Sequence, residues 1–133
     1  MKKILAVAIA LTLVGCGGKL QKEIEFASGI YTTVTETVVP ADVVIPVANA
    51  FDILKNAATN YGRYCIKNQH TPSICSADIR RQVVRGVRSG TAARNQLEVS
   101  IKTGQPALGS VYNVLVTAVN ALKQSPVRTV GAQ

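Results

Sequence analysis

The sequence has few aromatic, acidic and histidine residues. Only 5% of its 133 residues are aromatic, none is Trp, seven are Asp or Glu, and one is His. These counts leave little material for an active site, and the chain is too short for a dinucleotide-binding domain plus a substrate domain. With 17% charged and 47% hydrophobic residues, the chain is also unlike a disordered protein. We therefore expect one folded domain.

The first residues have the organisation of an export signal. Lys2 and Lys3 form a positive segment, and an apolar run of 11 residues extends from Ile4 to Val14, interrupted only by Thr12. A transmembrane helix needs about 20 such residues. The shorter run is typical of the hydrophobic region of a secretory signal peptide.

The end of this segment, Leu13-Val14-Gly15-Cys16, resembles the lipobox of bacterial lipoprotein precursors. That motif has an aliphatic residue, a small or aliphatic residue, a Gly, Ala or Ser, and then Cys. The resemblance covers only about the first sixteen residues of the chain. It implies that residues 1–15 are a cleaved signal peptide and that Cys16 carries lipid on its sulfur and amine. The membrane, reached through this lipid, is the first expected partner.

The residues after Cys16 bear on location. Gly17 and Gly18 begin a flexible tether over 16–22. Position 17 is not Asp, which in lipoproteins of Gram-negative bacteria favours the outer membrane, facing the periplasm. A Gram-positive host would place the protein on the outer face of its cell membrane. Loss of Lys2 and Lys3 lowers the formal net charge from +8 to +6, and stable anchoring is expected from several acyl chains.

Two further cysteines remain, Cys65 and Cys75. An even pair in an oxidising compartment predicts a disulfide, which would stabilise the fold by about 2–3 kcal/mol. Cys65, His70 and Cys75 also match the last part of a zinc knuckle, whose first Cys would fall at Gly62. Three ligands do not make a closed structural zinc site. We therefore expect no metal, and an exposed loop position for His70.

No catalytic motif is present in the sequence. It contains no G-x-S-x-G, no H-E-x-x-H and no Walker loop. His70 has no acidic residue near it in sequence, and Glu23 and Glu25 are interpreted as solvating charge beside the tether. We therefore expect neither an enzyme nor a cofactor.

The mature chain is predicted to be mainly α. Residues 23–41 are rich in Thr, Val and Ile and predict an extended arm, or one or two short strands. Apolar residues at steps of three and four then predict three helices, over residues 43–66, 77–102 and 106–123. Asp42 and Ser76 are the expected N-caps of the first two helices.

Short connections between these helices predict a small antiparallel three-helix bundle over 42–124, after the cleaved signal peptide and the arm. Residues 125–133 are expected to be a flexible tail. In the second helix, Gly86, Gly90 and Ala93 share the apolar face and would permit close approach of another helix. A bend near Ser89-Gly90-Thr91 is the alternative to a continuous helix, because each Gly costs roughly 1 kcal/mol relative to Ala.

The second helix also carries a candidate binding site for an anion or a partner. Its residues are Arg80, Arg81, Arg85 and Arg88. Three of them follow an i, i+4, i+7 pattern opposite the apolar face, and guanidinium groups suit bidentate phosphate contacts. The alternative is an ordinary solvated face. Arg94 lies nearer the apolar face, where it could pair with a carboxylate.

These features predict a lipid-anchored envelope protein that binds a partner through a basic helix face. The candidate partners are an envelope protein, a cell-wall polymer or an anionic lipid. Nucleic acid is not expected, because the chain is exported and no aromatic residues interleave the arginines. One alternative is an accessory lipoprotein of a phage or mobile element, acting in entry exclusion or lysis. Another is a structural component that self-associates through Gly86, Gly90 and Ala93; the oligomeric state stays open.

Overall fold

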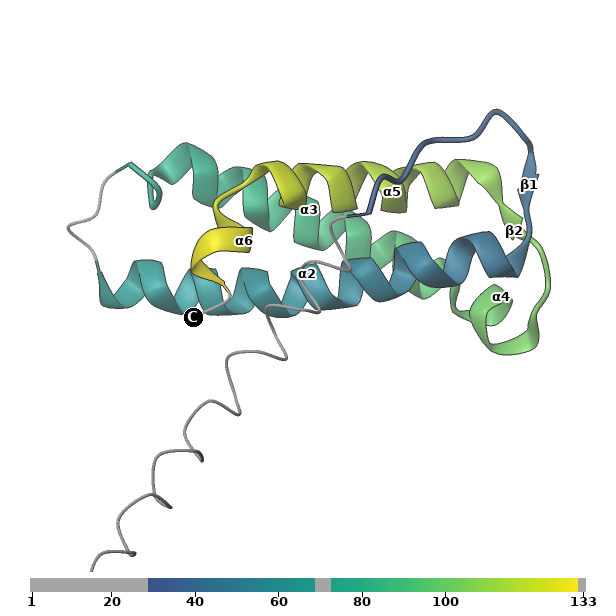
Figure 1. The fold of residues 1–133 in the computed structure, drawn as a ribbon, viewed down its shortest axis with the longest axis horizontal. Coiled ribbons are helices and arrows are strands. Elements are labelled where there is room, and N and C mark those ends of the chain that lie inside the picture. The colour runs from purple at the N-terminus through teal and green to yellow at the C-terminus, as the bar shows by residue number, and fades with distance from the viewer. Residues whose placement is uncertain (1–28, 69–72, 132–133) are drawn as a thin grey trace, which may run out of the picture.

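The computed structural model describes residues 29–68 and 73–131. Its elements, in chain order, are β1 (Val38–Val39), α2 (Ala41–Lys67), α3 (Ala77–Gln96), α4 (Glu98–Thr103), β2 (Ala107–Leu108), α5 (Gly109–Gln124) and α6 (Val127–Val130). The fold is mainly helical, with a small antiparallel sheet of β1 and β2 (Figure 1). The predicted signal peptide, the tether with Cys16, residues 23–28 and His70 lie outside the described residues.

Helix α2 corresponds to the first predicted helix. Its apolar side chains at steps of three and four are buried, among them Phe51 and Tyr61. The prediction that Asp42 is the N-cap is wrong, because the helix begins at Ala41 with Pro40 in the cap position. Asp42 lies instead in the first turn, where its carboxylate is close to the positive end of the helix dipole.

The second predicted helix is divided in two at Leu97. Helix α3 continues through Gly90, so a break near Ser89-Gly90-Thr91 is wrong. The chain bends at Leu97, which has φ −82° and ψ −5° and separates α3 from α4. Leu97 is buried, and α4 beyond it packs on α2. Because packing sets this bend and neither Gly nor Pro marks it, the sequence pattern does not reveal it.

Strand pairing delays the start of α5. The sequence predicts a helix from residue 106, but Ala107 and Leu108 pair with β1, with Leu108 opposite Val38. The helix begins at Gly109, whose backbone N–H donates to the Thr37 carbonyl at 2.8 Å. A Cβ at position 109 would lie 2.0 Å from the Glu36 carbonyl oxygen. A glycine is therefore needed where the arm crosses the start of α5.

The predicted flexible tail is wrong for residues 125–131. Val127–Val130 form α6, which packs on α2 and buries both of its valines. The buried Ser125 hydroxyl donates to the Leu122 carbonyl at 2.7 Å. The Asn60 amide donates to the Gly131 carbonyl at 3.1 Å. Two valines three residues apart are enough to dock one helical turn, although such a short stretch shows no periodicity in the sequence.

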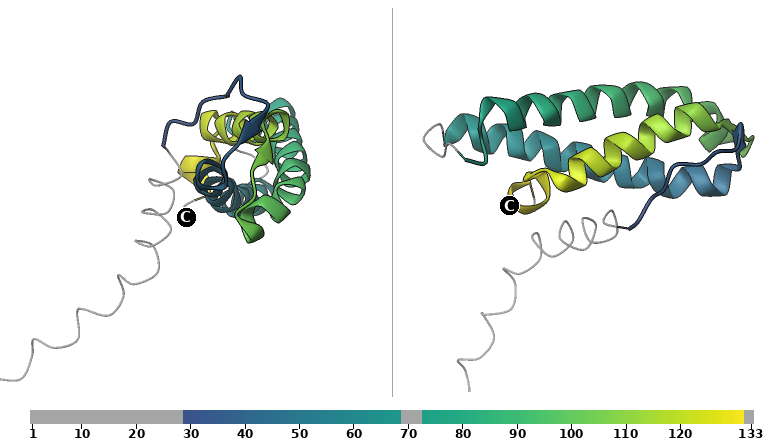
Figure 2. Two further views of the ribbon diagram at one scale, coloured as in Figure 1. Left: turned by 90° about the vertical axis from the view of Figure 1, so that its right-hand side faces the viewer. Right: turned by 90° about the horizontal axis from the view of Figure 1, so that it is seen from above.

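Helices α2, α3 and α5 lie side by side, with the apolar core between them (Figures 1 and 2). Small residues of α3 allow this close packing. A Cβ on Gly90 would lie 2.1 Å from Phe51 Cε2, and a Cβ on Gly86 would touch Leu122. Ala93 is buried on the same face. The chain's own helices therefore cover the surface that the self-association hypothesis requires.

Candidate functional site

Four exposed arginines line the outer side of α3. Arg80, Arg81, Arg85 and Arg88 are all exposed, while the buried residues of the helix lie on its other side. The structure therefore brings the four predicted site residues onto one surface, which we call the basic face. The exposed Val84 lies among them.

Few carboxylates pair with the arginines of the basic face. Its N-terminal end is fixed by Ser76, whose hydroxyl accepts the Ile79 N–H and caps α3 as predicted. Asp78, in the first turn, forms an ion pair with Arg81. Within residues 29–68 and 73–131, no carboxylate pairs with Arg80, Arg85 or Arg88. These guanidinium groups keep their donors available to an external anion.

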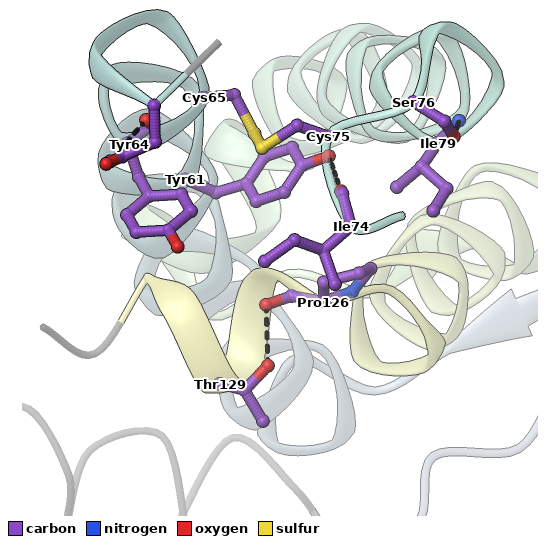
Figure 3. Close-up of a disulfide and its surroundings, with 10 residues drawn as sticks. Tyr61, Tyr64, Cys65, Ile74, Cys75, Ser76, Ile79, Pro126 and Thr129 are labelled. Atoms are coloured by element: carbon purple, nitrogen blue, oxygen red, sulfur yellow. Dashed lines mark hydrogen bonds between the residues drawn. A yellow bond between two sulfur atoms is a disulfide. The ribbon is translucent and has the colours of Figure 1, made fainter. Parts of the chain in front are cut away.

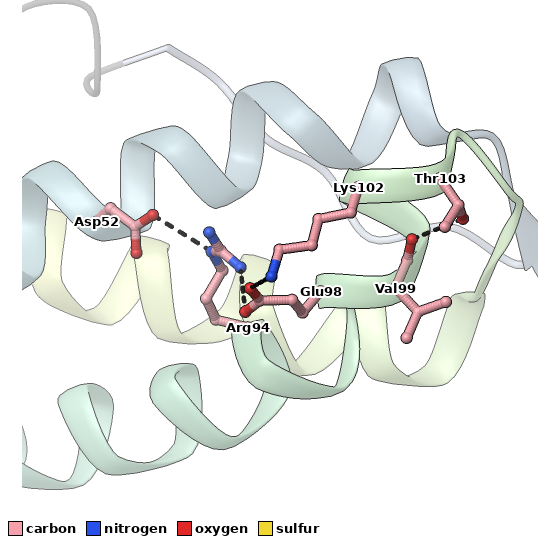
Figure 4. Close-up of polar contacts among 6 residues, drawn as sticks. All are labelled: Asp52, Arg94, Glu98, Val99, Lys102 and Thr103. Carbon is pink, nitrogen blue, oxygen red and sulfur yellow. Dashed lines mark hydrogen bonds and ion pairs between the residues drawn. The ribbon is translucent and has the colours of Figure 1, made fainter.

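Arg94, the fifth arginine of α3, has a different role. Its Nε donates to Asp52 Oδ2 at 3.2 Å and its Nη1 to Glu98 Oε2 at 3.4 Å, and its side chain is only 22% exposed (Figure 4). Lys102 Nζ donates to Glu98 Oε1 at 2.6 Å. The predicted pairing of Arg94 with a carboxylate is confirmed. This cluster joins α2, α3 and α4, so it stabilises the fold and leaves Arg94 outside the basic face.

The same cluster affects the acidity of Glu98. The hydrogen bond from Lys102 lowers the pKa of Glu98, and the positive charges of Lys102 and Arg94 lower it further. All these partners favour the ionised carboxylate.

The predicted disulfide between Cys65 and Cys75 is confirmed, with a Cα–Cα distance of 5.5 Å (Figure 3). It joins the last turn of α2 to the chain just before α3. Beside it, the buried Tyr61 hydroxyl donates to the Ile74 carbonyl at 2.6 Å. Burial raises the pKa of Tyr61, and the nearby charge of Arg80 partly opposes this shift. The cross-link and the tyrosine together fix the position from which the basic face begins.

Residues 29–37 form an arm that lies along α5. The Val34 N–H donates to Asn113 Oδ1 at 2.8 Å, and Asn113 Nδ2 donates to the Val34 carbonyl at 2.9 Å. Two turns further along α5, Asn120 donates to the Tyr31 carbonyl at 3.2 Å. Lys123 donates to the Gly29 carbonyl. The arm is therefore held by side chains of one helix, which bind its backbone.

The contact between Lys123 and Tyr31 completes this arrangement. Lys123 Nζ lies 5.6 Å from the centre of the Tyr31 ring. Burial lowers the pKa of Lys123, with a further contribution from the charge of Arg128, and burial raises the pKa of Tyr31. This site was not predicted from the sequence. Asn113, Asn120 and Lys123 are spaced at about helical turns, but α5 also contains Ser110, Thr117 and Gln124, so the spacing does not single them out.

The described part of the chain contains no group of three or more His, Cys, Asp or Glu side chains that could hold a metal ion. Within the same residues, no helix is both long enough and apolar enough to cross a membrane. No protein-family model, curated protein or solved structure matches the chain.

Proposed function

We propose that this chain is a lipid-anchored protein of the bacterial cell envelope whose helical domain binds a partner through the basic face of α3. Cys16 would carry the lipid, and the domain would be an antiparallel three-helix bundle of α2, α3 and α5. The outer membrane, facing the periplasm, is the proposed location. The support for the anchor is the lipobox resemblance of Leu13-Val14-Gly15-Cys16.

The contrast between Arg94 and the basic face carries the proposal for binding. Arg94 is used within the fold, where two carboxylates surround it. Among the described residues, Arg85 and Arg88 have no such partner and are exposed one turn apart. Neighbouring arginines repel one another, and an external anion would remove this repulsion. Binding of an anionic group therefore explains the arrangement better than a requirement of folding.

The test is crosslinking in cells, followed by affinity capture with the full chain. We expect the triple variant Arg81→Gln, Arg85→Gln, Arg88→Gln to lose a partner that the wild-type chain captures. A matched control adds the same change of net charge elsewhere, with Asn56→Asp, Gln105→Glu and Thr117→Glu at exposed positions. The control should keep the partner. Equal capture by all three proteins would contradict a role for the basic face.

A further inference from the structure

Exposed cations gather at the end of the molecule that holds the disulfide. They come from the last turns of α2, the first turns of α3, and α6, and they are Arg63, Lys67, Arg80, Arg81 and Arg128. The disulfide joins the first two of these segments, and α6 packs against α2. Figure 1 shows the end of α2 and the start of α3 at the same end of the ribbon, with α6 alongside α2 a little further in. We call this surface the basic end.

The charges are distributed unequally along the long axis. Among the described residues of the basic end, Asp78 is the acidic one, and it is paired with Arg81. The opposite end contains Glu36 beside β1, Asp42 in the first turn of α2, and Glu98 on α4, which is paired with Lys102. The electric field of an anionic surface would therefore orient the molecule with its basic end toward that surface.

An exposed apolar side chain lies within the basic end. Ile66 is 71% exposed in the last turn of α2, between Arg63 and Lys67 in sequence. One turn earlier, a Cβ at Gly62 would meet nothing within 4 Å. The turn of α2 next to Ile66 is therefore not covered by other parts of the chain that the structure describes. A protruding aliphatic group flanked by cations suits the boundary between headgroups and acyl chains, where both kinds of contact are available.

We propose that the basic end rests on the anionic phospholipid headgroups of a bilayer, with Ile66 inserted at the acyl boundary. The inference deepens the proposed function and rests on its lipid anchor, which would keep the domain at the membrane. Residues 17–28 span at most about 40 Å when extended, and α2 itself, with 27 residues, is about 40 Å long. The tether therefore allows the basic end to reach the surface.

The choice of a bilayer over a protein partner follows from how the cations are arranged. They come from three separate elements and converge on one end of the molecule, which suits an extended sheet of phosphates better than a single acidic side chain. A polysaccharide would also offer no apolar layer for Ile66. The acyl chains on Cys16 would already hold the chain at the bilayer, so the basic end would determine how the domain lies on it.

The experiment uses the full lipidated chain and exploits its lack of Trp. Ile66→Trp places a unique fluorophore in the basic end. Val99→Trp is the matched control, because Val99 is 62% exposed on α4 at the opposite end. Each protein is reconstituted in vesicles of phosphatidylcholine alone, or of equal parts phosphatidylcholine and phosphatidylglycerol, with brominated acyl chains as quenchers.

We expect quenching and a blue shift for the Ile66→Trp variant in the anionic vesicles only, and neither change for Val99→Trp. Adding Arg63→Gln and Lys67→Gln to the reporter should weaken the docking equilibrium by about fivefold for each cation removed. Adding Gln105→Glu and Thr117→Glu, with the same change in net charge, should leave it unchanged. Circular dichroism shows whether each variant keeps its helices.

Three results would overturn the inference: no quenching of the Ile66→Trp reporter, equal quenching in both lipid mixtures, or equal quenching of the Val99→Trp reporter. The proposed function is judged separately. Flotation of the chain with phosphatidylcholine vesicles reports the lipid anchor, and capture of a partner through the basic face reports binding. Neither Arg63 nor Lys67 belongs to the basic face, so the two proposals can fail independently.

Discussion

Gly90 of α3 lies directly against the ring of Phe51 of α2. A Cβ at position 90 would approach Phe51 Cε2 to 2.1 Å and Cζ to 2.6 Å, so the two helices meet where one has no side chain. Phe51 is fully buried in the core. The spacing between α2 and α3 therefore depends on a residue that, by helix propensity alone, is a poor choice.

The first prediction concerns this contact. Gly90→Ala should destabilise the domain by about 1–3 kcal/mol, because overpacking outweighs the roughly 1 kcal/mol gained in helix propensity. Gly62→Ala is the matched control on α2, where the added Cβ meets nothing within 4 Å. It should stabilise by about 0.5–1 kcal/mol. Chemical denaturation measures both changes, and a Gly90→Ala variant as stable as the wild type would refute the packing argument.

The second prediction concerns the disulfide, whose cysteines are separated by 10 positions in sequence. Reduction should lower the free energy of unfolding by about 2–3 kcal/mol, since the unfolded chain regains the entropy of an open loop. Melting curves recorded with and without reductant measure the effect. A double variant, Cys65→Ala and Cys75→Ala, should not respond to reductant. Identical wild-type curves under both conditions would count against a stabilising cross-link.

The third prediction concerns pH. Lys102 and Arg94 lower the pKa of Glu98 in the folded state. A lowered carboxyl pKa contributes stability above the unfolded value, about 4.3, and that contribution disappears as the pH falls through the folded value. The Glu98→Gln variant should therefore lose less stability than the wild type on acidification, measured by denaturation midpoints at neutral and acidic pH.

Glu36→Gln is the control for this comparison. It removes an exposed carboxylate that makes no ion pair within the described part of the chain. We expect its acid sensitivity to match that of the wild type, and added salt to reduce the difference shown by Glu98→Gln. Equal acid sensitivity of all three proteins would show that the cluster around Arg94 does not contribute.

The fourth prediction concerns the arm. Asn113→Ala removes both hydrogen bonds to the Val34 backbone, each with a net value of about 0.5–1.5 kcal/mol. We expect amide exchange at Val34 to become about tenfold faster or more, while the core of α2 keeps its protection. Asn56→Ala, at an exposed position of α2, is the control. Unchanged exchange at Val34 would mean that other contacts hold the arm.

Local patterns explain which parts of the fold were predictable. The buried stripe of α2, the Ser76 cap of α3 and the pairing of Cys65 with Cys75 all depend on residues close in sequence or on cysteine count. The four arginines of the basic face were predictable for the same reason. Helical spacing places them together once α3 is continuous.

The features that were missed depend on contacts between distant segments. Leu97 bends the chain because it packs into the core, α6 docks through Val127 and Val130 onto α2, and Asn113 binds the backbone 79 positions away. No local propensity encodes such contacts. The basic end was missed for a similar reason, because only the fold brings Arg128 to the same end as Arg63.

The contacts between α5 and the arm determine how far the domain can move from a membrane anchor. While Asn113 and Asn120 hold residues 29–37 against the helix, only the residues before the arm connect the domain to the proposed anchor at Cys16. If the arm were released, its nine residues would lengthen this connection by about 30 Å. The contacts of Asn113, Asn120 and Lys123 with the arm would thus determine how far from the membrane the domain can lie.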